Sequence, residues 1–272
     1  MGSDYTLAYG THSTANDGRC AMEWVSHLAG EPHSDQPACV SPVLRAYCTS
    51  LNDSLDNEPR QLLRPYLGRT IGTADDGLDE ARSWMALDWL IRTYAPTWLA
   101  AAGLTGSAHT LADLGLVMEA CDLEGALVEL KAARGDARAG WSGALGAARP
   151  AAWAPWAAGR AAAREAAWGS AGAAAWAAAR VAVGEIAGDR ARAMARDIAG
   201  DSAATIARAA RNAAGRAEAR EAARCALAPT LDALQHSAFA LLGRMLPTVP
   251  LARAIATDAD PLDREALIAP GR

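Results

Sequence analysis

Apolar residues recur at intervals of three and four along most of the chain, a spacing that predicts helices. The first predicted helix covers residues 21–29 and ends at Gly30. A second begins after Ser41, which is placed to cap it, with Pro42 at its first position. The clearest core helix lies at 77–101, with a break expected near Pro96. The pattern predicts an all-α fold.

Three further helix boundaries follow from capping and breaking residues. Thr110 is expected to cap a helix that starts at residue 111. Gly200 and the residues after it are expected to interrupt one helix and to cap the next. Pro229 is expected to open a closing amphipathic helix, because proline is tolerated in the first helical turn.

Alanine makes up 69 of the 272 residues and is concentrated in the second half of the chain. Alanine has the best intrinsic helix propensity, so long helices are expected there. We therefore predict a compact multi-helix domain over residues 1–132. An alanine-rich helical hairpin or bundle is expected over 133–246, and a loosely held tail over 247–272.

Large apolar residues are sparse in the alanine-rich part. At 100° per residue, Trp176, Val183, Met194 and Ile198 fall on one narrow face, which predicts a helix–helix contact within the chain or between two copies. Trp176 is the expected binding residue of this contact, since tryptophan is enriched at protein interfaces. The other tryptophans of the tract could be exposed, intermolecular or packed on the first domain.

Several classes of protein are disfavoured by composition. The sequence contains no run of 18 apolar residues, so a transmembrane helix is not expected. The first 30 residues do not resemble a secretory signal. Five cysteines without an export signal favour reduced thiols and a cytoplasmic location, with no structural disulfide. Neither of the common glycine-rich nucleotide motifs occurs, and no cofactor is expected.

Charge is divided unevenly along the chain. Residues 1–130 carry a net charge of −11 and residues 131–272 a net charge of +6. The basic half could face the acidic half or an anionic partner, or both could be ordinary solvated surfaces. Arginines between 180 and 224 are spread around the predicted helices, so a nucleic-acid partner is not expected.

The densest polar constellation runs from Cys20 to Cys39. Cys20, Glu23 and His27 share a helix face, and a thiol, a carboxylate and an imidazole could bind zinc together. Alternatively, Cys20 lies at a helix N-terminus, which favours a thiolate nucleophile, with any of the histidines as its base. The third reading makes Cys20 a buried small hydrophobe, Glu23 a surface charge and His27 exposed.

The stretch G-x-C-x-M-E-x-V-x-x-L-A-G-E-P-x-S-D-x-P-x-C over residues 18–39 resembles the opening of an uncharacterised family of actinobacterial and actinophage proteins. Residues 81–90 resemble a later block of the same family. The resemblance covers roughly residues 4–102 and implies a shared fold without an assigned activity. The motif leaves His27 and His33 open, so the candidate set is Cys20, Glu23, Glu31 and Asp35 as catalytic residues, with Ser34 and Cys39 as binding residues.

The leading hypothesis from the sequence is a non-enzymatic protein that binds a protein partner or itself, or acts as a scaffold. The competing hypotheses are a cysteine-dependent hydrolase centred on Cys20 and a metal-binding protein that uses the 20–39 region.

Overall fold

The computed structural model describes residues 5–143, 153–183, 185–214 and 218–247. Within these ranges every regular element is helical and no strand occurs, so the predicted all-α class is confirmed. The expected tail at 247–272 lies outside the described residues apart from Pro247, as do the side chains of Trp153 and Trp156.

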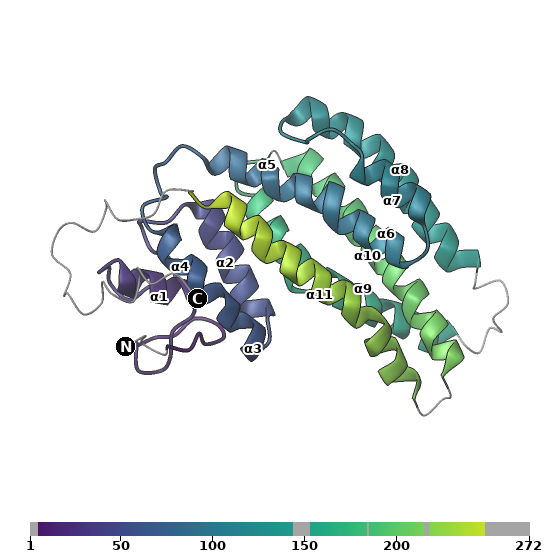
Figure 1. The fold of residues 1–272 in the computed structure, drawn as a ribbon, viewed down its shortest axis with the longest axis horizontal. Helices are drawn as coiled ribbons and strands as arrows, with labels where there is room; N and C mark the ends of the chain where they lie inside the picture. The colour runs from purple at the N-terminus through teal and green to yellow at the C-terminus, as the bar shows by residue number, and fades with distance from the viewer. Residues whose placement is uncertain (1–4, 144–152, 184, 215–217, 248–272) are drawn as a thin grey trace, which may run out of the picture.

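The first part of the chain folds into short helices that gather at one end of the molecule (Figure 1). Ser41 caps the second of them as predicted: its hydroxyl accepts from Leu44 N at 3.4 Å, and Pro42 occupies the first turn. In chain order these helices are α1 (Ala21–Leu28), α2 (Pro42–Ser54), α3 (Asn57–Arg60) and α4 (Arg64–Leu67), with short 3₁₀ turns at Gln61–Leu63 and Gly68–Thr70.

A second group of helices connects this end to the long helices. The core helix expected at 77–101 is α5 (Asp79–Trp89), a π-helical turn (Leu90–Tyr94) and α6 (Ala95–Ala101). These turns follow one another without a gap, so the chain is not broken at Pro96, which is the second residue of α6. Next comes α7 (Thr105–Ala112), which ends close to where the sequence predicted a helix to start. Thr110 is therefore not a cap but a residue inside α7.

The remaining helices are long: α8 (Ala120–Gly143), α9 (Trp153–Ala179), α10 (Glu185–Ala213) and α11 (Ala219–Met245). Two predicted boundaries are wrong. Helix α10 runs straight through Gly200, and Pro229 lies inside α11 rather than at its start. Gly200 has a packing role instead, because a Cβ there would clash with the side chain of Arg164 on the neighbouring α9.

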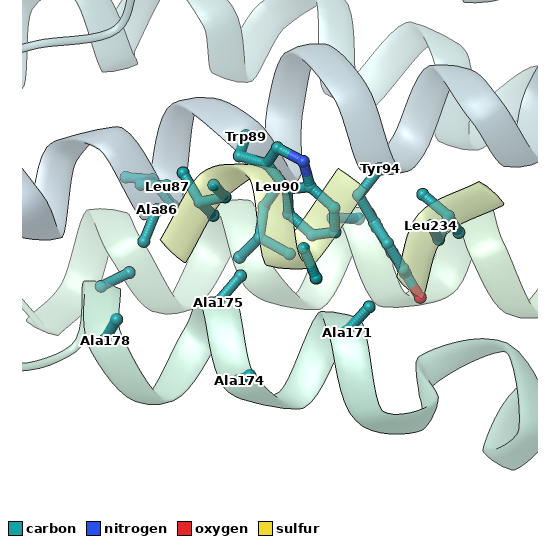
Figure 2. Packing of buried hydrophobic residues seen from close by; sticks show 14 of the residues in the cluster. Ala86, Leu87, Trp89, Leu90, Tyr94, Ala171, Ala174, Ala175, Ala178 and Leu234 are labelled. Carbon is teal, nitrogen blue, oxygen red and sulfur yellow. The ribbon is translucent and has the colours of Figure 1, made fainter. Parts of the chain in front are cut away.

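Helix α9 packs on α2 and α5 on one side and on α10 on the other, so the short helices and the alanine-rich helices share one hydrophobic core. Its buried positions are alanines, which face larger side chains of α5 and the π-turn such as Leu87, Leu90 and Tyr94 (Figure 2). Small residues allow the helix backbones to approach closely. The predicted division at residue 132 thus crosses a continuous core.

Buried hydrogen bonds tie the two parts together over large distances in the sequence. The hydroxyl of Tyr47 donates to Ala238 O at 2.9 Å, and that of Tyr94 donates to Ala167 O at 2.9 Å. Nε1 of Trp89 donates to Oγ of Ser237 at 2.9 Å. Each polar group of these buried aromatic rings is therefore satisfied by a long helix.

Ion pairs join α9 and α10 along their contact. Arg160 pairs with Asp201 and Arg164 with Asp197, while Arg134 of α8 reaches Asp197 at 3.7 Å. The Asp201 side chain is 3% exposed, which makes its arginine partner the compensation for a buried charge. No helix in the described part of the chain is both long and apolar enough to cross a membrane.

Candidate functional site

Glu23 is the centre of the polar cluster near the N-terminus. Its side chain is fully buried, and its carboxylate accepts three hydrogen bonds: from Cys20 N at 2.7 Å, from His12 N at 2.6 Å and from His12 Nδ1 at 2.8 Å. His33 Nε2 lies 3.8 Å from Glu23 Oε1 and donates to His12 O at 2.9 Å. Glu23 therefore joins α1 to the loop that precedes it.

The electrostatics of Glu23 favour the charged form. Burial by itself would raise the pKa of this carboxyl, but the N–H groups of His12 and Cys20 and the imidazole of His12 lower it below its ordinary value. The expectation that Glu23 is a surface charge is therefore wrong. His27 is exposed, as that interpretation expected, and its ring packs edge-on against Trp24.

Cys20 precedes α1 as its N-cap residue and is 3% exposed. Burial, together with the nearby Glu23 carboxylate, raises the pKa of the thiol to about 12. A nucleophilic cysteine needs the opposite, an accessible sulfur with a lowered pKa. Of the two histidines near this cluster, His12 bonds to Glu23 and His33 to His12 O. The geometry therefore gives no support to a hydrolase centred on Cys20.

The loop between α1 and α2 is held by hydrogen bonds of the candidate site residues that lie in it. Glu31 accepts from Ala38 N at 2.7 Å and from Cys39 N at 2.9 Å. Asp35 accepts from the Thr11 hydroxyl at 3.1 Å. Ser34 accepts from Ser26 Oγ through its carbonyl and from Gln36 N through its hydroxyl. These residues hold the loop in place, and we assign them this structural role.

Cys39 is half-buried beside Glu31 at the wall of an open depression of about 410 Å³. Burial and the Glu31 carboxylate raise the pKa of its thiol to about 11, so it is not activated either. Asp75 and Asp76 line the same depression.

The metal hypothesis finds no support in the donors of residues 20–39. Among the residues described, the potential ligand atoms of three such side chains converge within 4.8 Å only at Glu119, Cys121 and Asp122. Two of these three side chains are exposed, as acidic groups without a metal commonly are.

Trp176 is partly buried and packs within the chain. Arg192 of α10 lies over its ring at 5.0 Å, and a Cβ on Gly188 would lie 3.7 Å from the ring. The helical face that suggested this contact is interrupted, because α9 ends at Ala179 and α10 begins at Glu185. Trp168 packs edge-on against Tyr94 at 5.8 Å, toward the first part of the chain.

An open groove lies between α8 and α10, and sequence reasoning did not find it. It measures about 540 Å³, and its walls carry four apolar and three cationic side chains. Val128 is 65% exposed, whereas Met194 is 8% exposed. The lining residues are Leu127, Val128, Lys131 and Arg134 of α8 and Arg190, Ala193 and Met194 of α10.

A signal for this groove was present in α8. Leu123, Leu130 and Ala137 form its buried face. The adjacent residues Leu127 and Val128 point about 100° apart on a helix, so both cannot lie on that face. Val128 is followed within one turn by Lys131, the only lysine of the chain. An exposed valine beside a cation is by itself a weak indication of a binding groove, because the second wall of the groove comes from α10.

Comparisons with protein-family models, with curated proteins and with solved structures each gave no match.

Proposed function

We propose that this protein binds another protein chain without catalysing a reaction on it, and that the groove between α8 and α10 is the binding site. The observation that carries the proposal is the combination of an exposed apolar surface with cations on both walls. Such a surface is complementary to an apolar side chain with carboxylates around it.

The energetics of the groove suit a specific but moderate interaction. Covering Val128, Ala193 and the exposed part of Leu127 supplies the hydrophobic contribution, at roughly 25 cal/mol per Å² of apolar surface buried. The cations contribute more to orientation and association rate than to affinity. Along α8 the lining extends from Leu127 to Arg134, about 10 Å at 1.5 Å per residue, or two helical turns.

The small side chain of Ala193 keeps the groove open. Ala193 is exposed on α10 and lines the groove opposite the α8 residues. A large side chain at this position would fill the space without disturbing the core. The Ala193→Trp variant is therefore a direct way to block the site.

The test uses a defined probe, a fluorescent helical peptide with leucines at intervals of three and four residues, flanked by glutamates. Fluorescence anisotropy should show that this peptide binds, and that its glutamine analogue binds at least tenfold more weakly. Ala193→Trp and the double variant Lys131→Glu/Arg190→Glu should each weaken binding at least tenfold, about 1.4 kcal/mol.

The matched control is Arg138→Glu, which reverses an exposed charge one turn beyond Arg134 on the same helix and outside the groove. It should leave binding within twofold of the unmodified protein. If the peptide does not bind, or binds equally well to all these variants, the proposed function is wrong.

A further inference from the structure

A second surface of the same chain has the opposite character. Residues 74–80, which comprise the turn before α5 and the first two residues of that helix, include Leu78, which is 46% exposed. Asp75, Asp76 and Glu80 lie within three residues of Leu78 along the chain, and all three residues are exposed. We call this feature, an exposed leucine within three carboxylates, the acidic turn.

The acidic turn is held in a fixed shape. Asp76 accepts from Leu78 N at 3.1 Å and forms a two-point ion pair with Arg82. Arg82 is itself buried, and its Nε donates to Met245 O at the end of α11. Gly77 has a φ of +74°, a left-handed conformation that glycine adopts without strain. A protruding side chain on a rigid turn loses little conformational entropy when it binds.

From these two surfaces we infer that the occupant of the groove is a second copy of this chain, whose acidic turn inserts Leu78 between α8 and α10. This inference rests on the proposed function, since it names the partner of the same site. Leu78 would cover the surface around Val128, while the carboxylates of the acidic turn would lie among Lys131, Arg134 and Arg190.

Two features of the structure favour this occupant. Within a single chain Leu78 and Val128 both remain exposed, so the apolar part of neither surface is covered, and Lys131 and Arg190 of the groove are exposed as well. The charges are complementary as well: the acidic turn belongs to the half of the chain with net charge −11, and the cations of the groove belong to the half with net charge +6. Like-charged faces would repel each other, whereas this pair attracts at short range.

The proposed contact joins two different surfaces, the acidic turn of one copy and the groove of another, so two variants that each lack one surface can complement each other. Sedimentation velocity of the full chain should show a species of two or more copies that grows with concentration and shrinks with added salt. Leu78→Ser, which removes the apolar tip, and Ala193→Trp, which fills the groove, should each be monomeric. An equimolar mixture of the two variants should regain a two-chain species, because each supplies the surface that the other lacks.

Matched controls change similar residues outside the contact. Leu62→Ser alters another leucine that is 50% exposed, and Ala209→Trp alters another exposed alanine of α10. Both should associate like the unmodified protein, and circular dichroism should show that all four variants keep their helical content. An unmodified protein that stays monomeric, or a mixture that does not associate, overturns the inference. If the acidic peptide still binds the groove in that case, only the second copy is excluded as the occupant, and if it does not, the proposed function fails too.

Discussion

At the scale of single residues, Glu23 shows what sequence spacing can and cannot indicate. The spacing placed Cys20 and Glu23 at the N-terminal end of α1, and in the structure Cys20 is the N-cap residue and Glu23 lies in the first turn. Spacing could not indicate that His12 and His33, in the loops that flank α1, would both approach the Glu23 carboxylate. A surface carboxylate and a buried one look the same in sequence, and only the tertiary contacts made Glu23 a structural centre.

Replacing Glu23 with glutamine should destabilise the fold by about 3 kcal/mol. The amide cannot serve two backbone N–H groups and the imidazole as well as a carboxylate can, and hydrogen bonds to a charged group contribute about 1.5–3 kcal/mol. Chemical denaturation would measure the change in the free energy of unfolding. The control is Glu58→Gln at an exposed position, which should stay within 0.5 kcal/mol. An equally small loss for Glu23→Gln would contradict this account.

The same carboxylate should make stability depend on pH in the acid range. Because the native pKa of Glu23 lies below the ordinary glutamate value of 4.5, its contribution is complete above pH 4.5. The contribution declines as the pH falls through the lowered native pKa. Denaturation curves at a series of pH values should show a smaller acid loss for Glu23→Gln than for the unmodified protein. Parallel losses in the two proteins would show that another group is responsible.

Cysteine reactivity separates a structural Cys20 from a catalytic one. At a pKa of about 12, three units above the ordinary value of 9.0, Cys20 holds about a thousandfold less thiolate than an unperturbed cysteine. Mass spectrometry after brief alkylation of the native protein should find Cys121 and Cys225, which are exposed, labelled well before Cys20 and Cys48. The unfolded protein should label at all five cysteines. Fastest labelling at Cys20 would restore the hydrolase hypothesis.

At the scale of helices, composition predicted which segments are helical better than it predicted the residues at which the helices begin and end. The alanine-rich helices formed as expected, since propensity summed over long windows is informative. The predicted boundaries at Gly200 and Pro229 are wrong because glycine and proline usually interrupt helices, whereas tertiary packing keeps α10 and α11 helical at these positions. Close contact between helices explains glycines such as Gly172, where a Cβ would meet the Tyr94 ring at 3.2 Å.

Glycine-to-alanine substitutions should therefore change stability in opposite directions at two positions. Gly172→Ala should destabilise the protein by about 1 kcal/mol, because overpacking against the buried Tyr94 ring outweighs the gain in helix propensity. Gly135→Ala on the open side of α8 should stabilise it by about 0.5–1 kcal/mol. Thermal or chemical melts would give both values. Stabilisation by both substitutions would show that α9 is packed less closely than described.

At the scale of the whole molecule, the sequence predicted two helical parts, and this division stays a prediction. The structure adds a shared core, in which α9 lies against α2 and α5 and buried hydrogen bonds such as Tyr47 to Ala238 cross the boundary. The sequence also predicted unequal charge. The sequence could not indicate that cationic and exposed apolar side chains lie together in one groove, because the walls of that groove come from two helices that are distant in sequence, α8 and α10.

The shared core predicts a single cooperative unfolding transition. Near-ultraviolet circular dichroism, which reports the packing of the tryptophans, and far-ultraviolet circular dichroism, which reports the helices, should give coincident melting curves. A separate early transition in one signal would show that the two parts unfold independently.

The most direct test of the interaction site uses Lys131, the only lysine of the chain, which lies in the groove. A carbodiimide joins an amine to a carboxylate in contact with it, and a mixture of ¹⁴N- and ¹⁵N-labelled protein distinguishes links between chains from links within one. Peptide mapping should find Lys131 joined to Asp75, Asp76 or Glu80 of a differently labelled copy. Links from Lys131 that stay within one chain, or that reach another copy only at carboxylates outside the acidic turn, would contradict the account.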